Sequence, residues 1–180
     1  MILAGAALSC SAQGILASGQ ITGTLSGSSY NYLLTIADGG GATNSIGSVW
    51  YAWVPGQFYL ASVPSNLLAP TGWSAQEVSS GGYNSVRFLA SSSSFDIAPG
   101  ASLSGFGFTS VDTPAALGGN SVDYPATPVG TTVAYNAGFF STYSDTFVVA
   151  VVPEPTSLAL LLTGPLCWLA FHRRMRPSGR

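Results

Sequence analysis

Histidine, the side chain that most often acts as a general base, occurs once in this chain. His172 lies next to Arg173 and Arg174 near the C-terminus, and no histidine precedes it. Serine and cysteine nucleophiles are usually activated by an imidazole, and zinc sites commonly use histidine ligands. The body of the chain is therefore expected to hold neither a histidine-dependent catalytic site nor a histidine-bound zinc ion.

Carboxylates are the remaining acid–base groups, and they are spread singly along the body. Glycoside hydrolysis needs two of them on either side of one bond. Solvated carboxylates beside turns are the simpler interpretation of such a scattered set. The segment DGGGATN supplies oxygens from Asp38 and Asn44, but no EF-hand-like pattern accompanies it. The sequence predicts no enzyme, cofactor or metal; hydrolysis by Glu77 or an aspartate is a distant alternative. The acidic residues of the body are Asp38, Glu77, Asp96, Asp112, Asp123 and Asp145.

Aromatic side chains allow a second kind of chemistry, because flat rings can stack on sugars. In SVWYAWV, strand alternation places Trp50 with Val54 on one face and Tyr51 with Trp53 on the other, so at least one set is expected to fill a core. If an exposed platform exists, Trp53 and Trp73 are the expected stacking residues for a polysaccharide. The aromatics behind this alternative are Trp50, Tyr51, Trp53, Phe58, Tyr59, Trp73 and Tyr83.

Charge is scarce and unevenly placed. Charged residues make up 7% of the 180-residue chain, where about 25% is usual in soluble domains. From Gln20 to Ala150, Arg87 stands alone against six carboxylates, a net charge of −5. Nucleic-acid binding depends on clustered lysine and arginine, so that class of partner is excluded. Cys10 and Cys167 fall in the terminal apolar segments, which leaves the body dependent on a packed core.

Short β segments between turn residues are the expected structure of the body, assigned to residues 20–150. Their number and spacing predict an all-β fold, an antiparallel β-sandwich of immunoglobulin-like or jelly-roll type. In the expected strand SLSGFGFTS, Phe106 and Phe108 face the core, and Leu103 and Gly105 face away. The eight expected strands are Tyr30–Asp38, Ser48–Val54, Gln57–Val63, Trp73–Ser80, Ser85–Ser91, Ser102–Ser110, Thr131–Phe139 and Asp145–Val152.

The N-terminal residues 1–19 have the pattern of a secretory signal peptide. An apolar run from Ile2 to Leu8 is followed by small residues, with cleavage expected before Gln13 or before Ser18. The basic residues that usually precede such a run are absent, which is expected if translation starts upstream of Met1.

The C-terminal residues 151–180 combine three features in a fixed order. Pro153, Glu154 and Pro155 come first, an uncharged run from Leu158 to Phe171 follows, and an arginine cluster comes last. That run gives a helix of about 21 Å, short of the roughly 30 Å hydrocarbon core. The flanking prolines and the basic end nevertheless predict a single transmembrane helix with a cytoplasmic end. The arginines expected to set its orientation are Arg173, Arg174 and Arg176.

This ordered segment resembles the PEP-CTERM sorting signal of bacterial exported proteins. The resemblance implies that an exosortase, a membrane cysteine protease, recognises Pro153, Glu154 and Pro155 while the helix holds the substrate in the membrane. The fragment Ile97–Pro114 also resembles a strand of ectodomains found on such proteins, which implies a fold and not a reaction. The expected protein is an exported, non-enzymatic surface or matrix protein, anchored before processing and then retained at the surface or released. A polysaccharide-binding module is the alternative.

Overall fold

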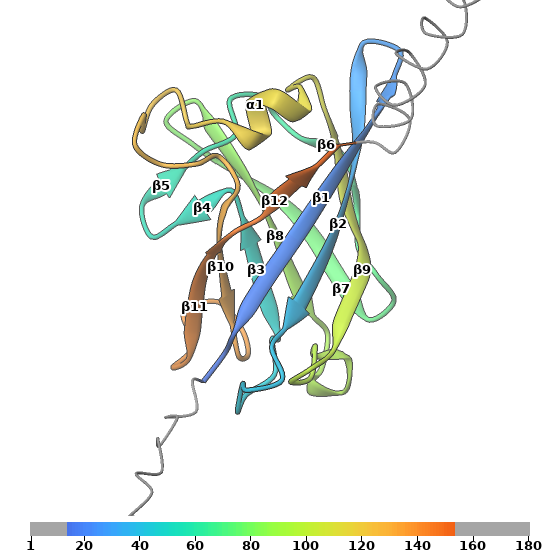
Figure 1. The fold of residues 1–180 in the computed structure, drawn as a ribbon, viewed down its shortest axis with the longest axis vertical. Helices are drawn as coiled ribbons and strands as arrows, with labels where there is room; N and C mark the ends of the chain where they lie inside the picture. Colours follow the sequence, from blue (N-terminus) through green and yellow to red (C-terminus); the bar gives the residue numbers. More distant parts are fainter. Residues whose placement is uncertain (1–13, 154–180) are drawn as a thin grey trace, which may run out of the picture.

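Two five-stranded β-sheets organise the part of the chain that the structure describes, residues 14–153, in a computed structural model (Figure 1). The first sheet has the strand order β12-β1-β2-β9-β6, the second has β11-β10-β3-β8-β7, and β4 and β5 form a separate hairpin. The elements are β1 Ala17–Ser26, β2 Ser29–Asp38, β3 Ser48–Tyr51, β4 Trp53–Val54, β5 Gln57–Phe58, β6 Ser65–Leu68, β7 Trp73–Ser80, β8 Tyr83–Ala90, the 3-10 helix Ser93–Phe95, β9 Ser102–Ser110, α1 Pro114–Gly118, β10 Thr131–Tyr135, β11 Ser144–Val148 and β12 Ala150–Val152.

The main core lies between the two sheets and is rich in aromatic rings. Phe106 of β9 packs edge-on against Phe88 of β8, with ring centroids 5.1 Å apart. The rings of Phe108 in β9 and Tyr51 in β3 also meet across the two layers, in a tilted arrangement with centroids 5.5 Å apart. These side chains are almost completely buried. The predicted all-β, sandwich-like architecture is therefore confirmed.

Two strands have the predicted limits, and the others differ in ways that have local causes. The bounds of β7 and β9 are those expected. The expected strand Ser48–Val54 is divided into β3 and β4 because Ala52 has a φ of 55°, which interrupts the extended backbone. β1 and β6 were not among the expected strands. β1 begins at Ala17, three residues before the expected start of the body at residue 20, and β12 ends at Val152, where the last expected strand ends.

A β-bulge at Gly105 changes the expected alternation of β9. Leu34 of β2 is paired with Phe106, but the next residue, Thr35, is paired with Ser104, so Gly105 is the extra residue. Gly105 has a φ of 98°, which glycine adopts without steric cost. Because of this shift Leu103 packs against the main core, whereas strict alternation predicted that it faces away. The prediction for Phe106 and Phe108 is confirmed.

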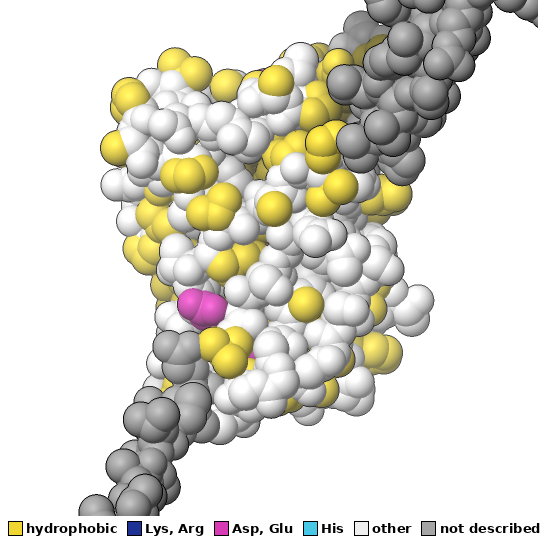
Figure 2. All heavy atoms as spheres, viewed as in Figure 1, with side chains coloured by type: hydrophobic (Ala, Val, Ile, Leu, Met, Phe, Trp, Pro, Cys, Tyr) yellow, Lys and Arg dark blue, Asp and Glu magenta, His cyan; other side chains and the backbone are white. Residues whose placement is uncertain are grey.

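The pairing of β12 is an exception to the antiparallel pattern. β12 runs parallel to β1, with Gln20, Ile21 and Thr22 opposite Ala150, Val151 and Val152. The other strand pairs in the described part of the chain are antiparallel. In Figure 2, hydrophobic side chains are scattered over this face of the molecule, and little charge is visible among its described residues. Both termini of the described chain thus lie along one edge of the first sheet (Figure 1).

Two carboxylates hold the chain at the start of β1. Asp38 Oδ1 accepts a hydrogen bond of 3.0 Å from the Leu16 N–H, and Asp145 Oδ2 accepts one of 2.8 Å from the Ala17 N–H. Burial raises the pKa of Asp38 above its usual value of 3.8; the N–H groups of Leu16 and Gly39 act against this effect, and the charge of Asp145 adds to it. Asp38 Oδ2 is buried and has no hydrogen-bond partner among the described residues.

We expect Asp38→Asn to remove part of the pH dependence of folding. The folded pKa is above the unfolded one, so the unfolded chain ionises first and the free energy of unfolding falls as pH rises above about 3.8. Asparagine keeps an acceptor for Leu16 but carries no charge, so the variant is expected to be the more stable of the two at pH 7 and to lose this advantage below pH 3.8. Urea unfolding of both proteins at several pH values measures the difference. A constant difference across that range would contradict this assignment.

Candidate functional site

The described structure ends at the first residue of the expected processing motif. Pro153 is exposed and follows directly on β12. Glu154, Pro155, the run Leu158–Phe171 and the arginines Arg173, Arg174 and Arg176 lie outside the described residues. Within residues 14–153, no helix has the length and apolar character needed to cross a membrane.

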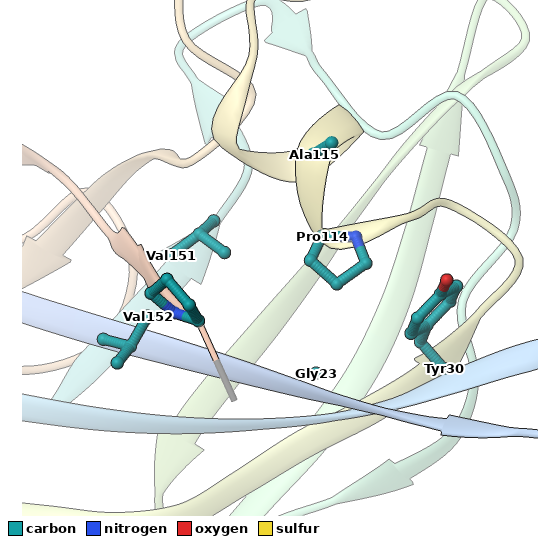
Figure 3. A pocket seen from close by; sticks show the side chains of 7 residues that line it. Gly23, Tyr30, Pro114, Ala115, Val151 and Val152 are labelled. Carbon is teal, nitrogen blue, oxygen red and sulfur yellow. The ribbon is translucent and has the colours of Figure 1, made fainter. Parts of the chain in front are cut away.

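A mainly apolar hollow lies beside this end of the chain (Figure 3). It has a volume of about 470 Å³ and is formed where α1 lies over β1, β2 and β12. Its wall includes Val151 of β12, Pro114 of α1 and Tyr30 of β2. The described residues that line it include no carboxylate, histidine or cysteine side chain. The lining residues are Gly23, Tyr30, Pro114, Ala115, Val151, Val152 and Pro153.

The two tryptophans expected to form a sugar platform are both buried. Trp73 is 8% exposed; its ring packs edge-on against Phe106, and its Nε1–H donates a 2.9 Å hydrogen bond to the Phe95 carbonyl oxygen. Trp53 is 3% exposed, and its ring stacks on Trp50 with centroids 3.7 Å apart. Neither ring presents an open face, so these positions do not form the expected platform.

The positive φ of Ala52 also changes which aromatic residues share a face. Strict alternation predicted Trp50 and Trp53 on opposite faces, but the turn at Ala52 brings them into a stack on the outer face of the second sheet. Tyr51 points the other way into the main core and is fully buried. Burial strongly raises the pKa of the Tyr51 hydroxyl, which keeps it protonated.

A second group of aromatic residues, the outer aromatic cluster, therefore covers the outer face of the second sheet. Its buried members are Trp50, Trp53, Val133 and Tyr135, and Val54, Phe58, Val78 and Phe139 pack against them. Cross-strand register explains part of this grouping, because Val133 of β10 is opposite Trp50 of β3, which is opposite Arg87 of β8. Gln76 of β7 completes the row on the far side of Arg87.

Arg87 is held in place within this row. Its Nε donates a 3.0 Å hydrogen bond to Gln76 Oε1, and its Nη2 contacts the same oxygen. The guanidinium carbon lies 5.9 Å from the Trp50 ring centroid and 5.5 Å from that of Phe139, within cation–π range. A groove of about 150 Å³ opens at this point, lined by Ser74, Gln76, Arg87, Leu89 and Phe139.

Sequence reasoning singled out Arg87 as the lone cation of the body but assigned it no role. The available signal was its place in SVRFLAS, where it alternates with Val86 and Phe88 and so must face outward while they face the core. Gln76 carried no such signal, because its contact with Arg87 depends on the pairing of β7 with β8.

Three carboxylates of the described chain bind backbone N–H or hydroxyl groups. Asp112 Oδ2 accepts hydrogen bonds from the Ser62 N–H and hydroxyl, and Asp38 and Asp145 bind the start of β1. Glu77 Oε1 is buried without a hydrogen-bond partner among residues 14–153. In that same range, no group of three or more histidine, cysteine or carboxylate side chains is placed to hold a metal ion. No protein-family model matches the chain, and no curated protein matches it.

Proposed function

We propose that this protein is exported and sorted through its C-terminal segment. In this proposal an exosortase-type protease recognises Pro153, Glu154 and Pro155, the run Leu158–Phe171 holds the substrate in the membrane, and the arginines fix its orientation. The observation that carries the proposal is the ordered series of proline motif, apolar run and basic end. It is supported by the place of the motif, which begins at an exposed residue directly after an edge strand.

The position of the motif suits recognition by a membrane enzyme. β12 has three residues and is bonded on one side to β1, so few backbone hydrogen bonds hold the last part of the sheet. Pro153 cannot donate a backbone hydrogen bond, which ends the strand at Val152. The last described strand therefore ends directly before the first motif residue.

The body would then serve as the exported domain, in a non-enzymatic structural role at the cell surface or in the extracellular matrix, including a biofilm. Its two sheets are in keeping with the immunoglobulin-like or jelly-roll group of sandwiches, in which one architecture hosts many functions. Its surface has no lysine and is rich in serine and threonine, which suits glycosylation. A mature protein with the mass of the bare polypeptide would remove the glycan part of the proposal.

The test compares the full chain expressed with and without an exosortase. Intact mass and membrane fractionation are measured for the parent chain and for Glu154→Ala, with Asp123→Ala as the matched control because Asp123 is an exposed acidic residue of the body. We expect a shorter product lacking the arginines only when the enzyme is present, formed by the parent and Asp123→Ala, and lost by at least tenfold in Glu154→Ala. Full-length protein in the membrane in every case would overturn the proposal.

A further inference from the structure

We propose that the groove beside Arg87 on the outer face of the second sheet binds an acidic saccharide, with Arg87 pairing to the carboxylate of one sugar unit. This inference does not rest on the sorting proposal, since every residue it uses lies within residues 14–153. The groove is the place where the positive charge of the described chain, hydrogen-bonding side chains and aromatic rings meet.

The guanidinium is oriented before any ligand arrives. Gln76 fixes it through Nε and Nη2, and the rings of Trp50 and Phe139 lie against it. Its contacts in the described chain are thus a neutral amide and two rings, which leave its positive charge uncompensated. The remaining N–H groups on Nη1 and Nη2 match the geometry of a carboxylate, which a guanidinium binds in a fork.

Next in the chain to Phe139, which lines the groove, is an exposed aromatic ring on a left-handed backbone. Phe140 follows Phe139, has a φ of 64° and is 67% exposed. A left-handed backbone is unfavourable for a bulky residue and is retained mainly where the surroundings or a function require it. The ring packs edge-on against Trp53 and Trp50, with centroids 5.8 and 6.0 Å away, so its position is set by the cluster although most of it faces solvent. Such a ring can stack on a sugar.

The size and polarity of the groove limit what it can hold. At about 150 Å³ it is smaller than the roughly 300 Å³ of a typical small-molecule pocket, so it suits one sugar unit of a longer chain. Ser74 and Gln76 add hydroxyl and amide groups for hydrogen bonds to sugar hydroxyls. A single arginine cannot hold a nucleic-acid backbone, which needs many cationic contacts.

The chemistry is tested with the full chain and an oligomer of galacturonic acid as the probe, by titration calorimetry and tryptophan emission. The same oligomer with its carboxyl groups reduced to alcohols is the matched ligand control. We expect the acidic oligomer to bind at least ten times more tightly than the reduced one, and Arg87→Gln to lose that preference. No binding of the acidic oligomer, or equal binding of the two, would overturn the proposal.

Phe140→Ala keeps the test valid if Arg87→Gln unfolds the protein. Because Phe140 is largely exposed, the variant is expected to melt within a few degrees of the parent and still bind the acidic oligomer several-fold more weakly. Leu33→Ala is the matched control, since Leu33 is 52% exposed on the outer face of the first sheet. Unchanged affinity in Phe140→Ala would overturn the role of the Phe140 ring in binding. An equal loss of affinity in Leu33→Ala would overturn the location of the binding site on the second sheet.

Discussion

Replacing Gly107 with alanine is expected to lower the free energy of unfolding by about 2–3 kcal/mol, the upper range for inserting atoms into a well-packed site. Gly107 is a buried residue of β9, and a Cβ atom there would overlap the carbonyl oxygen of Tyr32 and lie 3.2 Å from Leu33 Cδ2. The carbonyl belongs to the paired strand β2, so it cannot move away without breaking the ladder. β9 also supplies Phe106 and Phe108 to the main core, and displacing it would separate rings that join the two sheets.

Urea unfolding of Gly107→Ala and of Gly40→Ala measures this effect. Gly40 is the matched control because a Cβ there has no atom within 4 Å and its φ is not in the left-handed region. We expect Gly40→Ala to change the free energy of unfolding by less than about 0.5 kcal/mol, as is usual for exposed sites. Equal stabilities of the two variants would show that β2 and β9 tolerate separation at this point.

The sequence was sufficient to predict the architecture where alternation was uninterrupted. β7 and β9 have clear limits set by glycine and proline on either side, and their bounds agree with the prediction. The same rule failed for Leu103, because the bulge at Gly105 adds one residue and reverses the faces beyond it. A glycine within a strand pattern indicates such a bulge, but its effect depends on the partner strand.

The candidate groove was less predictable than the fold because it depends on an unusual backbone conformation and on which strands are neighbours. Ala52 adopts a positive φ that alanine rarely takes, so nothing in SVWYAWV indicated that Trp50 and Trp53 would stack. The contact of Arg87 with Phe139 joins β8 to a segment about 50 residues later in the chain. Contacts of this kind arise from strand order, which local patterns do not specify.

β1 was not predicted because its first residues belong to a segment that has the pattern of a signal peptide. Ile15 is buried in the main core, and Leu16 and Ala17 are bound by Asp38 and Asp145. The apolar character of this region thus reflects the fold at least from Ile15 onward. Of the two expected cleavage positions, the one before Gln13 leaves these contacts intact.

A chain that begins at Ser18 is therefore expected to lose most of its stability, whereas one that begins at Gln13 keeps it. The shorter chain lacks Ile15, whose burial is worth about 1.5–3 kcal/mol. It also lacks the Leu16 and Ala17 N–H groups that bind carboxylates, at about 1.5–3 kcal/mol for each hydrogen bond to a charged group. The sum is comparable to the whole stability of a small domain, about 5–15 kcal/mol.

Urea unfolding of the two versions, both ending at Arg180, tests this expectation, and the N-terminal sequence of the exported protein tests its consequence. A chain starting at Ser18 leaves Asp38 buried at 2% exposure without its partner on Leu16, so an uncompensated carboxylate remains beside the core. If the N-terminal segment is removed as a leader, this argument predicts cleavage upstream of Ile15, because a protein that begins at Ser18 lacks the contacts of Ile15, Leu16 and Ala17. Equal stability of the two versions, or an exported protein whose first residue is Ser18, would show that β2 and β12 hold the first sheet without these contacts.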